Sequence, residues 1–161
     1  MKNSSTIIEN QLHIVLFEPE IPPNTGNIAR LCACTGCSLH LIHPLGFSIN
    51  DKHLKRAGLD YWHHLDIHEY DNWSEFKSVV PVMDRCFGLS TKAVESIWNV
   101  QFQAGDMIVF GPESRGLPEY IRNEISLLKV PMLQHDSLRS LNLSSACSIV
   151  TYEALRQLNC A

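Results

Sequence analysis

The sequence predicts an α/β protein in which a mostly parallel sheet is flanked by helices. Short apolar segments rich in β-branched residues alternate along the chain with segments whose apolar residues recur at helical spacing. The chain has 161 residues, 45% of them hydrophobic, which suits one core of ordinary size. Since no linker, internal repeat or low-complexity tract interrupts it, residues 1–161 are predicted to form a single domain.

The first strand is predicted at Leu12–Phe17, a run of mostly apolar residues. It ends before the segment 18–23, in which three prolines are expected to exclude both a helix and a central strand. Asn24 or Thr25 then offers an N-cap for a helix, and Gly36 offers a left-handed stop.

A second strand, Ser38–Ile42, follows this helix. The order strand, helix, strand predicts a parallel, right-handed βαβ unit. Further along the chain, helices are predicted at 51–57, 72–79 and 142–158, and strands at 81–89, 107–110 and 127–130.

Charge and hydropathy exclude several classes of protein. A net charge of −4 argues against a protein that coats nucleic acids indiscriminately. No apolar run reaches the roughly 18 residues that a membrane span requires. The polar N-terminus lacks the pattern of a signal peptide, so a cytoplasmic location is expected.

The chain has six cysteines, and Cys34 and Cys37 form a C-x-x-C pair. No second ligand pair follows at the spacing of a zinc site, and the pair lies late in a helical segment, which weakens a redox role. Reduced thiols and no metal are therefore expected. The glycine-rich nucleotide motifs, G-x-S-x-G and H-E-x-x-H are also missing, which weakens dinucleotide, P-loop, hydrolase and metalloprotease interpretations.

Three segments that follow predicted strands carry turn residues and polar side chains: 18–30, 111–118 and 131–145. Ligands gather beyond the carboxyl ends of strands in such sheets. Glu113 is either an acceptor in a ligand loop or a structural residue that faces the N-terminus of the following helix. Ser140 and Asn142 either cap the last helix or belong to a loop that wraps a small ligand. Composition and spacing leave these alternatives open.

Together, the three segments resemble the three motifs of the SPOUT methyltransferases. The matching stretches are LFEPEIPPNTGNIARLCA at 16–33, RAGLDY at 56–61, FGPESRGLP at 110–118, VPM at 130–132, SLNLS at 140–144 and YEA at 152–154. The resemblance covers nearly the whole chain. It is closest to the tRNA (cytidine/uridine-2′-O)-methyltransferases of the anticodon wobble position.

This resemblance implies methyl transfer from S-adenosylmethionine to the ribose 2′-hydroxyl of the wobble nucleotide, with S-adenosylhomocysteine as the product and no metal. It also implies a deep trefoil knot near the C-terminus and a homodimer whose partner molecule is tRNA, bound by its anticodon loop. The alternative within the family is another tRNA or rRNA position. Two alternatives from other classes are a non-catalytic RNA-binding relative and a small-molecule α/β enzyme.

The resemblance also implies site residues by position. The catalytic candidates are Arg30, Asn24, Glu113 and Asn142. The cofactor-binding candidates are Leu89, Gly111, Val130, Met132, Ser140, Leu141 and Asn142. The tRNA-binding candidates are Lys55, Arg56 and Arg115. A guanidinium stays protonated at neutral pH and is a poor general base, so Arg30 is better suited to gripping a phosphate beside the target ribose. For Lys55 and Arg56, a solvated helix face is the alternative.

Overall fold

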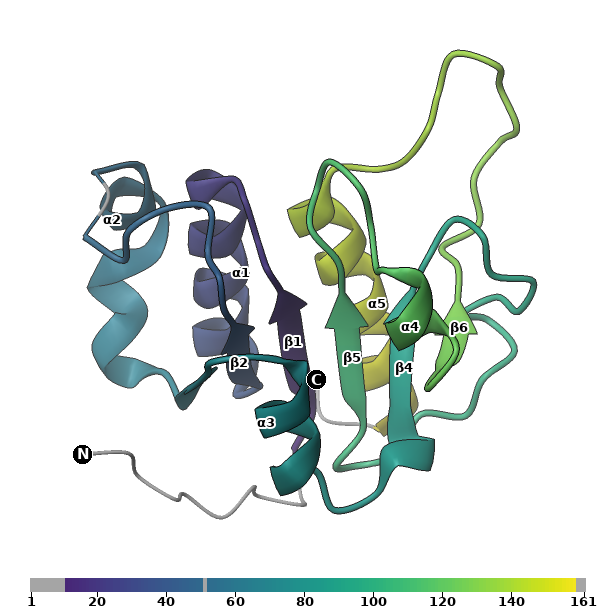
Figure 1. Ribbon diagram of the computed structural model, residues 1–161, viewed down its shortest axis with the longest axis horizontal. Helices are drawn as coiled ribbons and strands as arrows, with labels where there is room; N and C mark the ends of the chain where they lie inside the picture. The colour runs from purple at the N-terminus through teal and green to yellow at the C-terminus, as the bar shows by residue number, and fades with distance from the viewer. Residues whose placement is uncertain (1–10, 51, 159–161) are drawn as a thin grey trace.

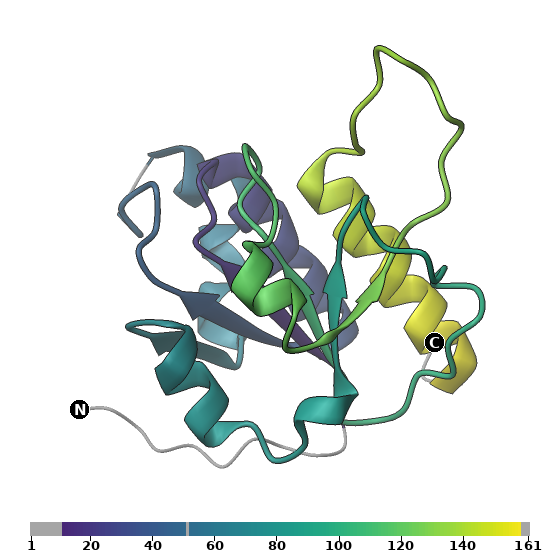
Figure 2. The same cartoon turned by 45° about the vertical axis from the view of Figure 1, so that its right-hand side comes forward.

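The computed structural model describes residues 11–50 and 52–158, with the backbone alone for residue 53 and residues 57–61. A six-stranded sheet runs through the centre, with helices on both faces (Figures 1 and 2). The strands are β1 (His13–Phe17), β2 (Ser38–Ile42), β3 (Ile67–Tyr70), β4 (Cys86–Leu89), β5 (Met107–Phe110) and β6 (Ser126–Leu128). The helices are α1 (Pro22–Thr35), α2 (Lys52–Gly58), α3 (Trp73–Val79), α4 (Glu119–Arg122) and α5 (Leu143–Leu158), with 3-10 turns at Leu59–His64 and Met83–Arg85.

The sheet order is β3-β2-β1-β5-β4-β6, and every neighbouring pair is parallel. Ile14 and Leu16 of β1 pack with α1 and α5 on one face, and Val15 and Phe17 pack with α3 and α4 on the other. Burial on both faces explains why the central strands are almost continuously apolar. The predicted α/β class and the first parallel βαβ unit are confirmed.

The start of α1 differs from the prediction. Pro22 and Pro23 lie inside the helix, at its first two positions, where the missing N–H groups cost no intrahelical bond. The N-cap is therefore Ile21, and the prediction that Asn24 or Thr25 caps the helix is wrong. The predicted stop is confirmed, because Gly36 has φ 74° and its N–H donates to Cys32 O at 2.9 Å.

Several short elements also differ from the prediction. β3 was not predicted, because its four residues, Ile-His-Glu-Tyr, form neither an apolar run nor an alternating pattern. The strand expected at 81–89 is confined to Cys86–Leu89, since a 3-10 turn occupies Met83–Arg85. The four residues of α4 were not predicted either. Asn72 caps α3 by accepting from Glu75 N at 2.9 Å.

A buried chain of polar rings crosses the first three strands. His13 Nδ1 lies 2.9 Å from His40 Nε2, and His40 Nδ1 lies 2.9 Å from the hydroxyl of Tyr70. The His40 ring also stacks on His68, with centroids 4.7 Å apart. Burial, together with the neighbouring imidazoles, holds the pKa of His40 well below its usual value. His40 is therefore neutral in the folded protein at physiological pH.

Candidate functional site

The segments 18–30 and 111–118 meet where the neighbouring strands β1 and β5 end, and the end of the segment 131–145 reaches them at Asn142 (Figure 1). β1 and β5 are neighbours, but the chain continues from β1 to β2 on one side and approaches β5 from β4 on the other. The strand order therefore reverses between β1 and β5. Ligand sites of open parallel sheets lie at such a switch point.

Glu113 is the centre of the contacts between these segments. Its carboxylate accepts from Glu20 N at 2.8 Å, from Ile21 N at 3.1 Å and from Asn24 Nδ2 at 3.2 Å. It thus supplies the cap that Ile21 lacks, and its negative charge lies at the positive end of α1. The structural alternative, in which Glu113 faces the helix that follows its own loop, is wrong: the helix it caps lies about ninety residues earlier in the chain.

Asn24 links Glu113 to the start of α5. The residue is buried, and its Oδ1 accepts from Asn142 Nδ2 at 3.0 Å. Asn142 Oδ1 in turn accepts from Ser144 N at 2.9 Å and from Ser145 N at 3.3 Å, so Asn142 also caps α5. Asn142 therefore caps α5 with its oxygen and contacts Asn24 with its NH₂ group, so the two alternatives for this residue are compatible. The predicted catalytic residues Glu113, Asn24 and Asn142 form one hydrogen-bonded path.

Two further contacts join the same segments. Ser114 donates its N–H and its hydroxyl to Glu20 Oε1, at 3.0 and 2.7 Å, and these bonds hold the pKa of Glu20 below its usual value. Arg115 forms an ion pair with Glu18, whose φ is 46°. Glu18, Glu20 and Ser114 were not among the predicted site residues, because their pairing depends on β1 and β5 being neighbours.

Three of the predicted cofactor residues lie at adjoining strand ends. Leu89 ends β4, Gly111 follows β5 directly, and Val130 lies just beyond β6. All three are partly buried. A Cβ on Gly111 would overlap the backbone of Gly116 and Leu117, so the chain crosses itself closely at this position.

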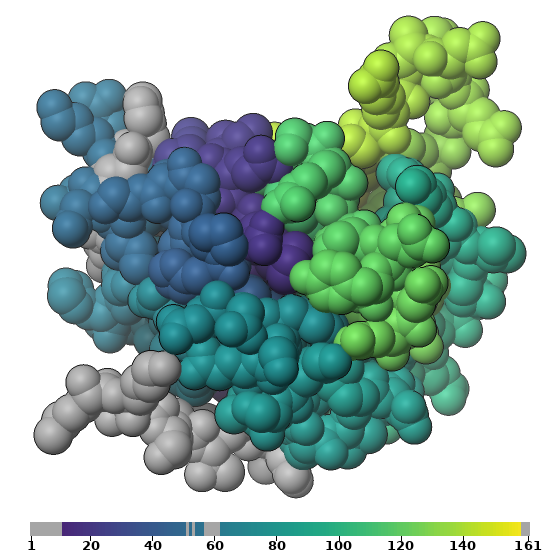
Figure 3. Space-filling model, viewed as in Figure 1, coloured from purple at the N-terminus to yellow at the C-terminus, as the bar shows by residue number. Residues whose placement is uncertain are grey.

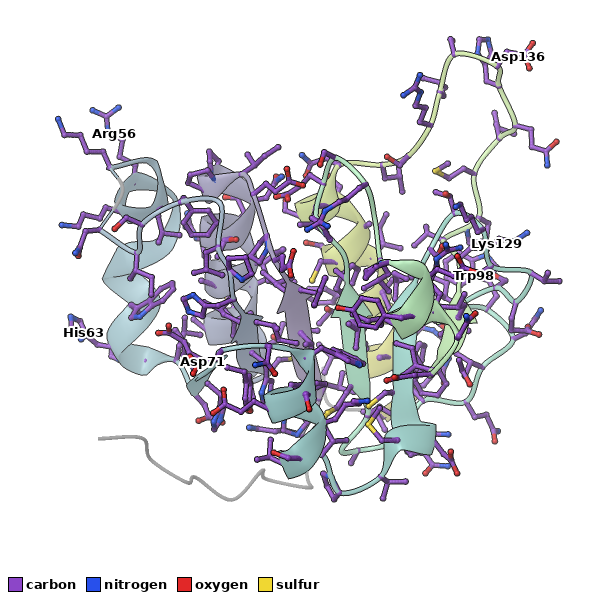
Figure 4. All side chains as sticks on the ribbon, viewed as in Figure 1. Arg56, His63, Asp71, Trp98, Lys129 and Asp136 are labelled. Atoms are coloured by element: carbon purple, nitrogen blue, oxygen red, sulfur yellow. The ribbon has the colours of Figure 1, made fainter. Side chains whose placement is uncertain are left out.

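The other predicted cofactor residues lie on or beside an exposed loop. Residues 131–140 are all exposed, and the loop arches away from the sheet (Figures 1 and 3). Asp136 lies near its far end (Figure 4). Met132, Ser140 and Leu141 are therefore not packed into a wall with Leu89 and Val130. Two open surface hollows, of about 420 and 330 Å³, lie elsewhere, beside Trp98 and beside Tyr120.

The predicted cations are exposed. Arg30 lies further along α1 than Asn24, outside the hydrogen-bonded path, and the Arg115 side chain lies beside Glu18. Lys55 and Arg56 lie on α2, and Arg56 points into solvent (Figure 4). Their exposure is compatible with both RNA contact and a solvated face.

Within residues 11–50 and 52–158, no three His, Cys, Asp or Glu side chains are grouped as metal ligands. The five cysteines in these ranges are free thiols, and burial raises the pKa of Cys86 and of Cys147 to about 12. Cys160 lies outside the described residues. In the same part of the chain, none of the helices has the length and apolar character needed to cross a membrane.

Residues 11–152 match the SpoU rRNA Methylase family. A tRNA (cytidine(34)-2'-O)-methyltransferase of Yersinia pestis is 53% identical over 156 residues, which cover 91% of this chain and 94% of that protein. The enzyme of the same name from Saccharophagus degradans is 53% identical over 154 residues, covering 92% and 97%.

Solved structures agree with this match. One, from work on 2-OH methylation of C/U34 on tRNA, is 46% identical with a TM-score of 0.89, covering 94% of this chain and 99% of that chain. AviRb of Streptomyces viridochromogenes in complex with AdoMet is 21% identical with a TM-score of 0.81, covering 96% and 63%, and shares the fold. The resemblance found in the motifs is thus confirmed, and the chain belongs to the SpoU rRNA methylase family.

Proposed function

We propose that this protein transfers the methyl group of S-adenosylmethionine to the ribose 2′-hydroxyl of nucleotide 34, the wobble nucleotide of tRNA. The observation that carries the proposal is the path Glu113–Asn24–Asn142, which joins all three motif segments at the switch point of the sheet. Relatives that span almost the same length carry the name of this activity.

The residues at the ends of β4, β5 and β6 suit a pocket for S-adenosylmethionine. Leu89 and Val130 offer apolar walls, and Gly111, which follows β5 directly, would contribute its backbone to the pocket between them. Ser140, Leu141 and Met132 would complete the pocket from the loop. When bound, S-adenosylmethionine supplies a methyl group on a sulfonium, which is already a strong electrophile. The protein therefore has to align the ribose oxygen with this methyl and ease the loss of the hydroxyl proton.

Arg30 is assigned to the phosphate next to the target ribose, which a guanidinium can hold with two parallel hydrogen bonds. Asn24 and Glu113 orient the start of α1, the helix that carries Arg30. Lys55, Arg56 and Arg115 are assigned to the anticodon arm. Their exposure at the surface leaves them accessible to phosphates.

The proposal includes a trefoil knot, formed by the segment between β6 and α5, and a homodimer in the cytoplasm. Support for the dimer comes from α5. Ile149 and Tyr152 are 38% and 53% exposed, whereas Val150 and Ala154 of the same helix are fully buried. Apolar side chains on the outer side of a core helix are typical of a subunit interface.

The test is methyl transfer from radiolabelled S-adenosylmethionine to unmodified tRNA, followed by mapping of the 2′-O-methyl group. We expect modification at position 34. Methylation of another tRNA or rRNA position would favour the alternative substrate. Calorimetry that detects no S-adenosylmethionine binding to the folded protein would overturn the proposal and favour an RNA-binding protein or a small-molecule enzyme.

A further inference from the structure

Glu20 and Glu113 hold each other's segments by reciprocal hydrogen bonds. The Glu113 carboxylate accepts from the backbone N–H of Glu20, and the Glu20 carboxylate accepts from the backbone N–H and the hydroxyl of Ser114. The two segments are 93 residues apart in the chain. The pattern is that of a capping box, but it joins two loops instead of closing one helix turn.

Neither loop is held by regular secondary structure of its own. Residues 18–21 lie between β1 and α1, and residues 111–118 form an irregular turn in which Gly116 has φ 67°. The backbone of Glu20 is also confined from behind. A Cβ on Gly46 would lie 2.8 Å from Glu20 Cα, and Gly46 N donates to Pro19 O at 2.9 Å. With its backbone pressed against this turn, Glu20 presents its carboxylate to Ser114 from a fixed position.

The position of Glu113 decides the orientation of Asn24. A carboxylate only accepts hydrogen bonds, so it selects the NH₂ group of the Asn24 amide. The Asn24 oxygen is then turned toward Asn142 Nδ2, 3.0 Å away. A Glu113 loop released from Glu20 would let this amide rotate and would loosen the link to α5.

We infer that Glu20 is a positioning residue for methyl transfer, acting through Ser114 and Glu113 on Asn24 and on the start of α1. The inference rests on the proposed function, since it assigns a role in that reaction. Glu20 itself touches neither reacting group. Its contribution is to hold the 111–118 turn against α1, so that catalytic side chains from two segments keep one relative position.

The experiment compares two pairs of variants in the full-length protein. Glu20→Gln removes the negative charge, leaves a single acceptor oxygen for the two Ser114 donors and replaces the Oε2 contact of the hydroxyl by an NH₂ group. Glu119→Gln removes an exposed carboxylate from the nearby α4 as the control. Ser114→Ala removes the hydroxyl donor, and Ser114→Thr keeps it. Kinetics with tRNA and S-adenosylmethionine give kcat and both KM values, and thermal denaturation gives Tm.

We expect Glu20→Gln and Ser114→Ala to lower kcat about tenfold, which corresponds to ~1.4 kcal/mol of transition-state stabilisation. Both KM values should stay within about twofold. Ser114→Thr and Glu119→Gln should keep the wild-type kcat, and the double variant Glu20→Gln/Ser114→Ala should lose little more than either single one.

Unchanged kcat in Glu20→Gln would overturn the inference while leaving the proposed function intact. A loss of kcat that is seen only near the Tm of a variant, and that disappears at a temperature where all variants are folded, would overturn it as well. Failure of the wild-type protein to methylate tRNA would instead contradict the proposed function. The wild-type assay therefore separates the two claims.

Discussion

At the scale of single residues, the Glu113 carboxylate combines a structural and a functional contact. It accepts from two backbone N–H groups at the start of α1 and from Asn24. A glutamine there has one acceptor oxygen, and its NH₂ group would face other donors. We expect Glu113→Gln to lower the free energy of unfolding by about 1–2 kcal/mol, the usual range for a lost helix cap, and to lower kcat. Urea denaturation and methyl-transfer rates measure both, with Glu95→Gln, on an exposed loop, as the control.

Arg30 gives a second prediction at this scale. Its proposed partner is an RNA phosphate rather than the cofactor, so Arg30→Ala should abolish methyl transfer and leave S-adenosylmethionine affinity within about twofold. Arg30→Lys should restore only part of the activity, because an ammonium cannot form the bidentate contact. Calorimetry and single-turnover kinetics test this, and a wild-type rate for Arg30→Ala would show the assignment to be wrong.

Gly111 and Gly36 differ in what an added side chain would meet, so alanine at Gly36 serves as the control for alanine at Gly111. A Cβ at Gly111 would overlap the backbone of Gly116 and Leu117, whereas a Cβ at Gly36 meets nothing within 4 Å and only opposes a φ of 74°. Gly36→Ala should therefore cost about 1–2 kcal/mol of stability and leave S-adenosylmethionine binding unchanged. Gly111→Ala should displace the 111–118 turn and weaken binding at least tenfold, as measured by calorimetry. Equal binding by both variants would contradict the role given to this turn.

At the scale of the elements, the buried rings across β1, β2 and β3 make stability depend on pH. The pKa of His40 is lowered in the folded protein, mainly by burial and then by His13 and His68. Between this lowered value and the unfolded value of about 6.5, the unfolded chain binds a proton that the folded protein does not. The stability is thus complete above about pH 6.5 and is lost as the pH falls below it.

This dependence can be measured by urea denaturation between pH 8 and pH 5. The free energy of unfolding should decline below about pH 6.5 in the wild-type protein and in His135→Asn, which changes an exposed loop residue. His40→Asn should be less stable but should decline less. The facing groups are His13, His68, Tyr70 and Asp66, and the lowered pKa of Asp66 confines its effect to a more acidic range. An unaltered slope in His40→Asn would assign the dependence to another group.

The elements also show how far the sequence alone could lead. Strands such as β2 and β5 were predicted residue by residue, because parallel strands buried on both faces are short apolar runs. β3 and α4 were missed, because four residues are too few for a period to be recognised. The cap of α1 could not be predicted from its own segment, since it comes from Glu113. The motifs identified Asn24, Glu113 and Asn142 as candidate site residues. The hydrogen bonds between them could not be predicted, because they depend on the order of the strands in the sheet.

At the scale of the whole molecule, the proposed homodimer places the outer side of α5 against a second copy. A charged residue buried there would be costly, so Tyr152→Asp and Ile149→Asp should convert the dimer to a monomer in sedimentation equilibrium. Val94→Asp is the control, because Val94 is 92% exposed and lies outside α5. A wild-type protein that sediments as a monomer, or variants that stay dimeric, would exclude this surface as the interface.

The hydrogen bonds of the site join residues 93 and 118 positions apart. Contacts between such distant residues form late in folding, because the intervening chain loses entropy before they are made. During synthesis the N-terminal segments emerge first, so α1 leaves the ribosome without the carboxylate that caps it. Asn24 gains its last partner only when residue 142 has been added. A nascent chain that has not reached residue 142 therefore lacks the assembled hydrogen-bonded path of the proposed site and is not yet competent for methyl transfer.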